Sequence, residues 1–260
     1  MKIVVLCKYV PNAISERKFV EGDKTTDRVG VDGLLSELDE YAVEEAMKIK
    51  EAGDATVTIL TVGPAQAADA VRKALQMGAD AGVHIVDDSI AGSDALATSL
   101  VIAKALEKIG EYDLVMAGMA STDGEMGVVP AMVAERLGLP HAGYLGNLEV
   151  GDGEVKGRRD GDAATEHVVA PLPAVVGVTD QINDPRYPSF KGIMAAKKKP
   201  LETWSLADLG VSADEVGLSA AWTSVAEIAK RPPRGKGEVV TDEGDGGAKL
   251  VEYLASKKFV

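Results

Sequence analysis

Cysteine is nearly absent from this chain of 260 residues, since Cys7 is the only one. A single cysteine excludes a disulfide framework within the chain and fits a reducing compartment. No apolar run approaches the ~20 residues that a membrane span needs, so we expect no direct insertion into a membrane. The N-terminal segment lacks the features of a secretion signal or a transit peptide, and we expect a cytoplasmic protein.

Basic residues are also fewer than acidic residues. The chain carries 28 Lys and Arg against 41 Asp and Glu, for a net charge of −13. An acidic chain repels phosphate backbones, so we expect no nucleic-acid partner. Aromatic residues make up 4% and apolar residues 46% of the sequence. The core must therefore be built mostly of Val, Leu, Ile and Ala.

Familiar catalytic motifs are missing as well. His84, His141 and His167 have no partner at metal-ligand spacing, and Cys7 has no second cysteine in a CxxC pair, so we expect no metal site. The sequence has no nucleophile elbow, no His-Glu-x-x-His and no Walker A loop. We therefore expect a binding protein without catalytic residues of its own rather than an enzyme.

Strands and helices alternate through the first half of the chain. Short apolar runs predict buried strands at residues 2–7, 56–62, 82–86 and 113–118. Apolar stripes predict helices that begin after Ser36, near residue 65, after Ser93 or Asp94, and at Met126. Asp39 is placed to close a capping box with Ser36. This alternation predicts an α/β fold with a mostly parallel sheet flanked by helices, Rossmann-like, whose ligands bind beyond the carboxyl ends of the strands.

The second half changes character. Short alternating strands are predicted near 143–150, 154–159 and 165–170, with a buried strand at 174–178, and we expect this block to extend the sheet. Residues 200–245 are rich in loop formers, so this segment is either disordered or lies across another subunit. Trp204, Leu209 and Trp222 favour the second alternative. We thus expect an α/β domain at 1–199 and a C-terminal arm at 200–260, which ends in a helix near 248–258.

The best candidate for binding a small molecule is the segment 118–127, with the sequence GMASTDGEMG. Gly118, Gly124 and Gly127 permit close approach of a ligand or a positive φ. The following helix N-terminus offers free N–H groups, which suits a phosphate. The alternative is a plain strand-to-helix loop that needs glycine to turn. Residues 7–12 and 61–64 would flank the same edge, which favours a nucleotide pocket.

Lys197, Lys198 and Lys199 end a helix that is predicted to begin near Ser189. Two interpretations stay open for these cations. They complement the negative end of the helix dipole, or they form a basic spot for an acidic partner.

Several motifs occur together in a fixed order. DPRY at 184–187 precedes IMAAKKK at 193–199, and AVEEA at 42–46, GPAQ at 63–66, ALQMGAD at 74–80, LPAVV at 172–176 and DLGV at 208–211 accompany them. In this ordered set of motifs the chain resembles the electron transfer flavoprotein beta subunits, over at least residues 1–211.

The resemblance implies a heterodimer with an alpha subunit that mainly holds FAD, while this chain holds a structural AMP. Electrons would come from dehydrogenases, such as the acyl-CoA dehydrogenases of fatty acid beta-oxidation, and leave to a membrane quinone oxidoreductase. Carried over by position, the nucleotide pocket comprises Leu6, Cys7, Ser36, Leu60, Thr61, Val62, Gly118, Met119, Ala120, Ser121, Thr122, Asp123, Gly124, Glu125, Met126, Gly127, Val128 and Val129. The phosphate would bind the backbone of residues 123–129.

The resemblance also implies a recognition loop at residues 179–196 that docks the dehydrogenase. Its docking residues would be Arg186, Tyr187, Phe190, Ile193 and Met194. The anchor falls on Phe190, where some relatives have leucine. Ala13 stands where relatives can place a tyrosine near the flavin.

Two alternatives to this function are kept. Some relatives bind a second FAD in place of AMP and bifurcate electrons from NADH, and the loop at 118–129 does not decide between the two. A more remote alternative is a domain that binds and hydrolyses ATP. The absence of a phosphate loop with a lysine and the match at the recognition loop argue against it.

Overall fold

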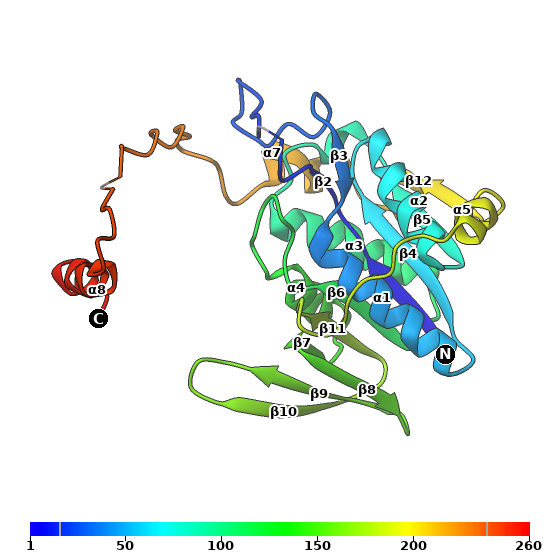
Figure 1. Cartoon of the computed structure of the whole chain (residues 1–260). Coiled ribbons are helices and arrows are strands. Elements are labelled where there is room, and N and C mark those ends of the chain that lie inside the picture. The colour runs from blue at the N-terminus through cyan, green and yellow to red at the C-terminus, as the bar shows by residue number, and fades with distance from the viewer. Residues whose placement is uncertain (16, 238) are drawn as a thin grey trace. The chain divides into compact units, whose positions relative to one another are not determined.

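The computed structural model describes residues 1–15, 17–237 and 239–260. The chain divides into two compact units, Met1–Ala226 and Glu227–Val260. The first unit contains the sheet and the candidate site, and its ribbon is shown in Figure 1. In the described ranges no helix is long and apolar enough to cross a membrane.

The centre of the first unit is a parallel sheet of seven strands in the order β12-β5-β4-β1-β6-β11-β7. The strands are β1 (Lys2–Leu6), β4 (Thr56–Val62), β5 (Ala81–Ile85), β6 (Leu114–Gly118), β7 (His141–Leu145), β11 (Ala174–Val178) and β12 (Leu201–Trp204). All six pairings are parallel. The predicted parallel α/β fold is confirmed.

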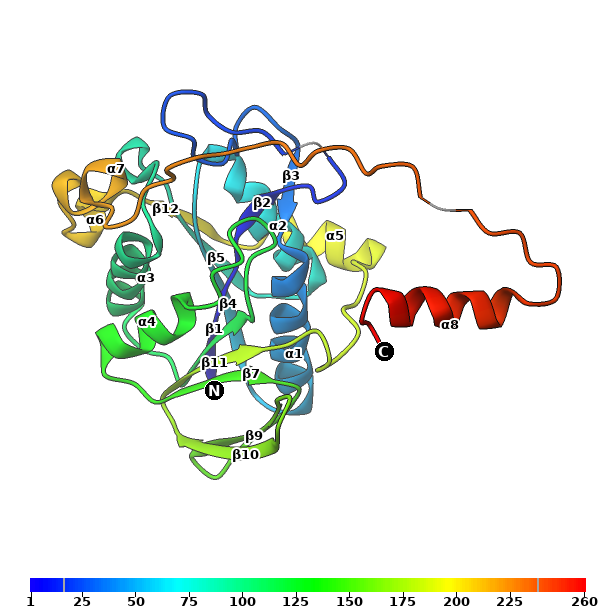
Figure 2. The ribbon, with the colours of Figure 1, turned by 90° about the vertical axis from the view of Figure 1, so that its left-hand side faces the viewer.

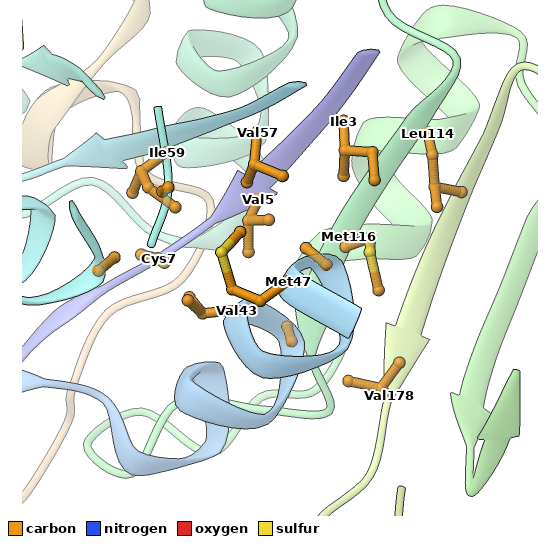
Figure 3. Packing of buried hydrophobic residues seen from close by; sticks show 14 of the residues in the cluster. Ile3, Val5, Cys7, Val43, Met47, Val57, Ile59, Leu114, Met116 and Val178 are labelled. Atoms are coloured by element: carbon orange, nitrogen blue, oxygen red, sulfur yellow. The ribbon is translucent and has the colours of Figure 1, made fainter. Parts of the chain in front are cut away.

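Helices cover both faces of this sheet, as Figure 2 shows. On one face lie α1 (Glu37–Ala52) and α2 (Ala68–Met77), and on the other lie α3 (Ala95–Ile109) and α4 (Val129–Leu137). Because side chains alternate along a strand, Ile3 and Val5 face the first pair, whereas Val4 and Leu6 face the second. Figure 3 shows Val5 and Val57 facing Val43 and Met47 of α1.

The start of α1 differs in detail from the prediction. Ser36 is the N-cap residue, but its side chain makes no capping hydrogen bond, so the predicted capping box is wrong. The carboxylate of Asp39 instead accepts a hydrogen bond from the backbone N–H of Lys8 at 2.8 Å. The predicted helix that begins near residue 65 is confirmed. A 3₁₀ turn, η1 (Ala65–Ala67), leads into α2, which is followed by Gly78 with φ +139°.

The antiparallel block is divided between two sheets. β7 and β11 extend the main sheet as expected, but β8 (Asn147–Gly151), β9 (Glu154–Asp160) and β10 (Thr165–Pro171) form a separate antiparallel sheet. The expectation that the whole block extends the sheet is therefore wrong for these three strands. Their residues alternate between polar and apolar, which suits a sheet with one solvated face rather than a buried parallel one.

Residues that follow position 200 belong partly to the first unit. β12 adds to the edge of the main sheet beside β5, and α6 (Leu206–Leu209) buries Leu206 and Leu209. The remaining short elements are β2 (Tyr9–Pro11), β3 (Gly33–Leu35), η2 (Asp88–Ile90), α5 (Phe190–Ala196), η3 (Ala213–Glu215) and α7 (Gly217–Ala220). The second compact unit begins at Glu227, and it contains α8 (Gly246–Ser256).

Candidate functional site

The three loops predicted to share one edge do so. β1 lies between β4 and β6, so the carboxyl ends of these parallel strands meet at the same edge. The N–H of Cys7 donates to the carbonyl of Leu60 at 2.9 Å, and the N–H of Ser36 donates to the carbonyl of Lys8 at 2.9 Å. The backbone around Cys7 is thus fixed to the end of β4 and to the start of α1.

Not all predicted residues of this edge contribute side chains to it. Leu6 and Leu60 are buried in the core beneath α3, and Cys7 is buried in the core beneath α1. Burial raises the pKa of the Cys7 thiol well above its ordinary value. Leu60 therefore packs in the core, whereas Val62 at the strand end is half-buried.

The loop after β6 is longer than predicted. The helix that follows begins at Val129 rather than at Met126, so residues 119–128 form an extended loop. Gly127 has φ +65°, and its carbonyl accepts a hydrogen bond from the hydroxyl of Tyr144 at 3.1 Å. A Cβ on Gly118 would lie 2.5 Å from the carbonyl oxygen of Leu38. The need for glycine at these two positions is therefore structural.

Asp123 is the electrostatic centre of this loop. Its side chain has no exposed surface, and its carboxylate is 2.8 Å from Nζ of Lys8 and accepts a hydrogen bond from Nε of Arg28 at 2.8 Å. Arg17 donates to the carbonyls of Thr122 and Asp123. Burial raises the pKa of Asp123, but the charges of Lys8 and Arg28 outweigh burial and hold it well below its ordinary value.

Lys8, Arg17 and Arg28 were missed by the sequence analysis. Each lies more than 90 residues from Asp123 along the chain, and no spacing or motif marks them. Two of these cations, Lys8 and Arg28, contact the Asp123 carboxylate, and Arg17 contacts the backbone beside it, in a chain that is acidic overall. This local excess of positive charge suits an anionic ligand.

Buried hydroxyls without a partner surround the same edge. Among the described residues, the side-chain oxygens of Ser36, Thr61 and Thr122 are buried and make no hydrogen bond. All three were predicted members of the nucleotide pocket. An unsatisfied buried polar group costs about 1–3 kcal/mol, so a ligand that supplies a hydrogen bond would stabilise each of them.

The recognition loop presents an apolar surface. Tyr187 and Phe190 are 92% and 81% exposed, and Ile193 and Met194 are also exposed. Ser189 caps α5, since its hydroxyl accepts a hydrogen bond from the N–H of Gly192 at 3.0 Å. The predicted start of this helix is confirmed.

Two basic residues in or just after the recognition loop are engaged within the chain. The guanidinium of Arg186 contacts Glu44 and Glu51 on α1. Nζ of Lys199 donates to the carbonyl of Leu75 at 2.9 Å, which favours a structural role for this lysine. Lys197 and Lys198 are exposed at the end of α5, so both interpretations of these two residues stay open.

The architecture defines a Rossmann-like α/β protein with a polar edge at the carboxyl ends of its central strands. A family model described as an electron transfer flavoprotein domain matches residues 24–209. The chain is 50% identical to the electron transfer flavoprotein subunit beta of Mycobacterium leprae (strain TN), over 99% of each chain. It is 34% identical to the caffeyl-CoA reductase-Etf complex subunit CarD of Acetobacterium woodii, over 100% of each chain.

The electron transfer flavoprotein subunit beta of Megasphaera elsdenii is also similar, with 30% identity over 99% of this chain and 97% of that protein. The chain belongs to the electron transfer flavoprotein family, and it matches the beta subunits of that family over their whole length.

Proposed function

We propose that this chain pairs with an alpha subunit as half of a heterodimeric electron carrier, that it binds AMP, and that it docks dehydrogenases such as acyl-CoA dehydrogenases. Electrons then pass through FAD, held mainly by the alpha subunit, to a membrane quinone oxidoreductase. In this role the chain acts in the cytoplasm and has no catalytic residues of its own.

The observation that carries the AMP assignment is the group of unpaired hydroxyls on Ser36, Thr61 and Thr122 at one edge of the sheet. A nucleoside offers several groups that pair with hydroxyls. The phosphate would bind the backbone N–H groups of residues 123–129, and Lys8 and Arg28 add positive charge beside this loop. The residues present therefore fit a phosphorylated nucleoside.

The exposed apolar side chains of the recognition loop support the docking assignment. Tyr187 and Phe190 are large aromatic residues that an isolated chain leaves in water. Aromatic side chains of this kind are common hot spots of protein interfaces. A small anchor suits a carrier that must release each partner quickly, because a limited interface gives fast dissociation.

A second candidate is a carrier with a second FAD in place of AMP. It is kept because the family that the chain resembles includes relatives with a second FAD in place of AMP. An adenine dinucleotide would use the same edge, since it shares the adenosine phosphate group.

Co-expression with an alpha subunit tests the proposed function. We expect a yellow 1:1 heterodimer whose flavin is bleached anaerobically by an acyl-CoA dehydrogenase with its substrate, and re-oxidised by a quinone oxidoreductase. A colourless monomer that gains no flavin from any alpha subunit would contradict the proposal. ATP turnover by the purified chain would favour the remote alternative of an ATP-hydrolysing domain.

A further inference from the structure

The recognition loop is fastened to α1 by polar side chains before it reaches its exposed aromatic residues. Nδ2 of Asn183 donates to the backbone carbonyl of Tyr41 and to Oε2 of Glu45, both at 3.0 Å. This segment has no helix or strand of its own between β11 and α5. Its position therefore depends on side-chain contacts with α1 rather than on a hydrogen-bonded ladder.

Arg186 makes the densest set of these contacts. Its Nε donates to Oε2 of Glu44 at 2.7 Å, and one terminal nitrogen donates to Oε1 of Glu44 at 2.9 Å and to Oε2 of Glu51 at 3.0 Å. The other terminal nitrogen donates to Glu51 as well. The backbone N–H of Arg186 also donates to Glu44, at 3.1 Å. The carboxylate of Glu44 thus binds both the side chain and the backbone of Arg186.

The geometry of α1 explains why one guanidinium reaches both acids. Glu44 and Glu51 lie seven residues apart, which places them on one face of the helix, two turns from each other. The Glu44 side chain is 8% exposed. A nearly buried carboxylate needs a charged, hydrogen-bonded partner, and a planar fork of donors satisfies it better than a lysine does.

The C-terminal part of the recognition loop, in α5, is fixed as well, by packing against α2. A Cβ on Gly192 would lie 2.4 Å from the carbonyl oxygen of Gln76, so α5 packs against α2 with almost no space between them. Figures 1 and 2 show α5 beside α2. The segment with Tyr187 and Phe190 is therefore held at both ends, by α1 before it and by α2 after it.

We propose that Arg186 is a positioning residue, which clamps the recognition loop to Glu44 and Glu51 so that Tyr187 and Phe190 are presented in a fixed place. The expected docking role of Arg186 itself is replaced, because its donors are used within the chain. The inference rests on the proposed docking function. Holding the loop in advance lowers the ordering cost that docking would otherwise carry.

The test uses the co-expressed heterodimer with Arg186→Met, Arg186→Lys, Glu44→Gln and the double variant Arg186→Met/Glu44→Gln. The control is Arg158→Met, which removes an exposed arginine that pairs with Asp160 on β9, outside the recognition loop. One readout is hydrogen exchange of the backbone amides of residues 182–189. The other is KM and kcat for reduction of the heterodimer by the dehydrogenase.

We expect Arg186→Met to speed exchange at residues 182–189 about tenfold, as local opening becomes easier. KM for the heterodimer should rise about tenfold with kcat and flavin content unchanged, because the loop must be ordered during docking. Arg186→Lys should show a smaller change in the same direction. Glu44→Gln should follow Arg186→Met, and the double variant should add little, since both act through one contact.

A direct contact of Arg186 with the dehydrogenase gives a different pattern. Glu44→Gln would then leave KM unchanged or lower it, while Arg186→Met raises it, and exchange would not change. That outcome would overturn the inference. If docking itself does not involve this loop, Phe190→Ala leaves KM unchanged, whereas the exchange result still reports whether Arg186 holds the segment.

Discussion

Nζ of Lys8 lies 2.8 Å from Oδ1 of Asp123, and this ion pair joins the loop after β1 to the loop after β6. The two residues are separated by 115 positions in the chain. Arg28 completes the contact from the segment before β3. The ion pairs of Asp123 with Lys8 and Arg28 therefore connect the loops of the candidate edge, in addition to the apolar packing of the sheet.

Asp123→Asn should destabilise the chain by about 2 kcal/mol, below the usual cost of breaking a buried pair because Lys8 and Arg28 are partly exposed. The pKa of Asp123 is held below its ordinary value, so its contribution is present above about pH 4 and is lost as the pH falls further. Urea unfolding at pH 7 and pH 3.5 measures both effects. The difference in unfolding free energy between the wild type and the variant should be smaller at pH 3.5 than at pH 7.

A matched control for that substitution is Asp69→Asn. Asp69 also pairs with an arginine, Arg72, but both side chains are mostly exposed. Removal of such a surface pair should cost less than about 0.5 kcal/mol. Equal stability losses for the two variants would show that the ion pairs of Asp123 stabilise the fold no more than an exposed surface pair does.

Asp39 has the opposite pH dependence. Burial raises its pKa to about 7, although the N–H of Lys8 opposes the shift. An unfolded aspartate has a pKa of about 3.9, so the folded chain keeps a proton between about pH 4 and 7 that the unfolded chain loses. Stability should therefore fall as the pH rises through this range. Asp39→Asn should flatten the profile of unfolding free energy against pH, and a variant profile parallel to that of the wild type would contradict this.

Gly118→Ala should disturb the joint between β6 and α1. The added methyl group would meet the carbonyl oxygen of Leu38, a backbone atom that cannot move aside alone. Overpacking of this kind costs typically about 1–3 kcal/mol. Thermal unfolding and nucleotide content measure the effect, with Gly53→Ala as the control because the nearest atom there is 4.0 Å away. Unchanged stability in Gly118→Ala would refute the close approach.

Phe190→Ala should weaken docking without loss of flavin. Truncation of an aromatic hot spot costs about 2 kcal/mol or more, which corresponds to roughly a 30-fold rise in KM for the heterodimer. Steady-state reduction by the dehydrogenase gives KM, and the visible absorbance gives flavin content. Phe19→Ala is the control, since Phe19 is a partly exposed phenylalanine outside the recognition loop. Equal effects of the two variants on KM would contradict the assignment of Phe190 as the anchor.

The sequence predicts the parts of this fold in which one local signal decides the structure. Strand 56–62 matches β4 because a buried apolar run ends at Gly63 and Pro64. The start of α4 was placed at Met126, but Gly127 with its positive φ and Pro130 in the first turn delay the helix to Val129. Local patterns cannot rank such competing signals.

The candidate site was predicted where it depends on strand order and missed where it depends on distant partners. The edge at β1, β4 and β6 follows from the topology of a parallel sheet. The cations around Asp123 do not, because nothing local links residue 8 or 28 to residue 123. Arg186 was assigned to docking from the resemblance alone. Its contact with Glu44, 142 positions away in the chain, leaves no local signal in the sequence.

The nucleotide content of the purified heterodimer tests the central claim most directly. Denaturation of the complex with an alpha subunit releases its nucleotides, which chromatography with absorbance detection can identify and count. The account predicts one FAD and one AMP per heterodimer. Two FAD and no AMP would contradict it and would favour the alternative with a second FAD in place of AMP.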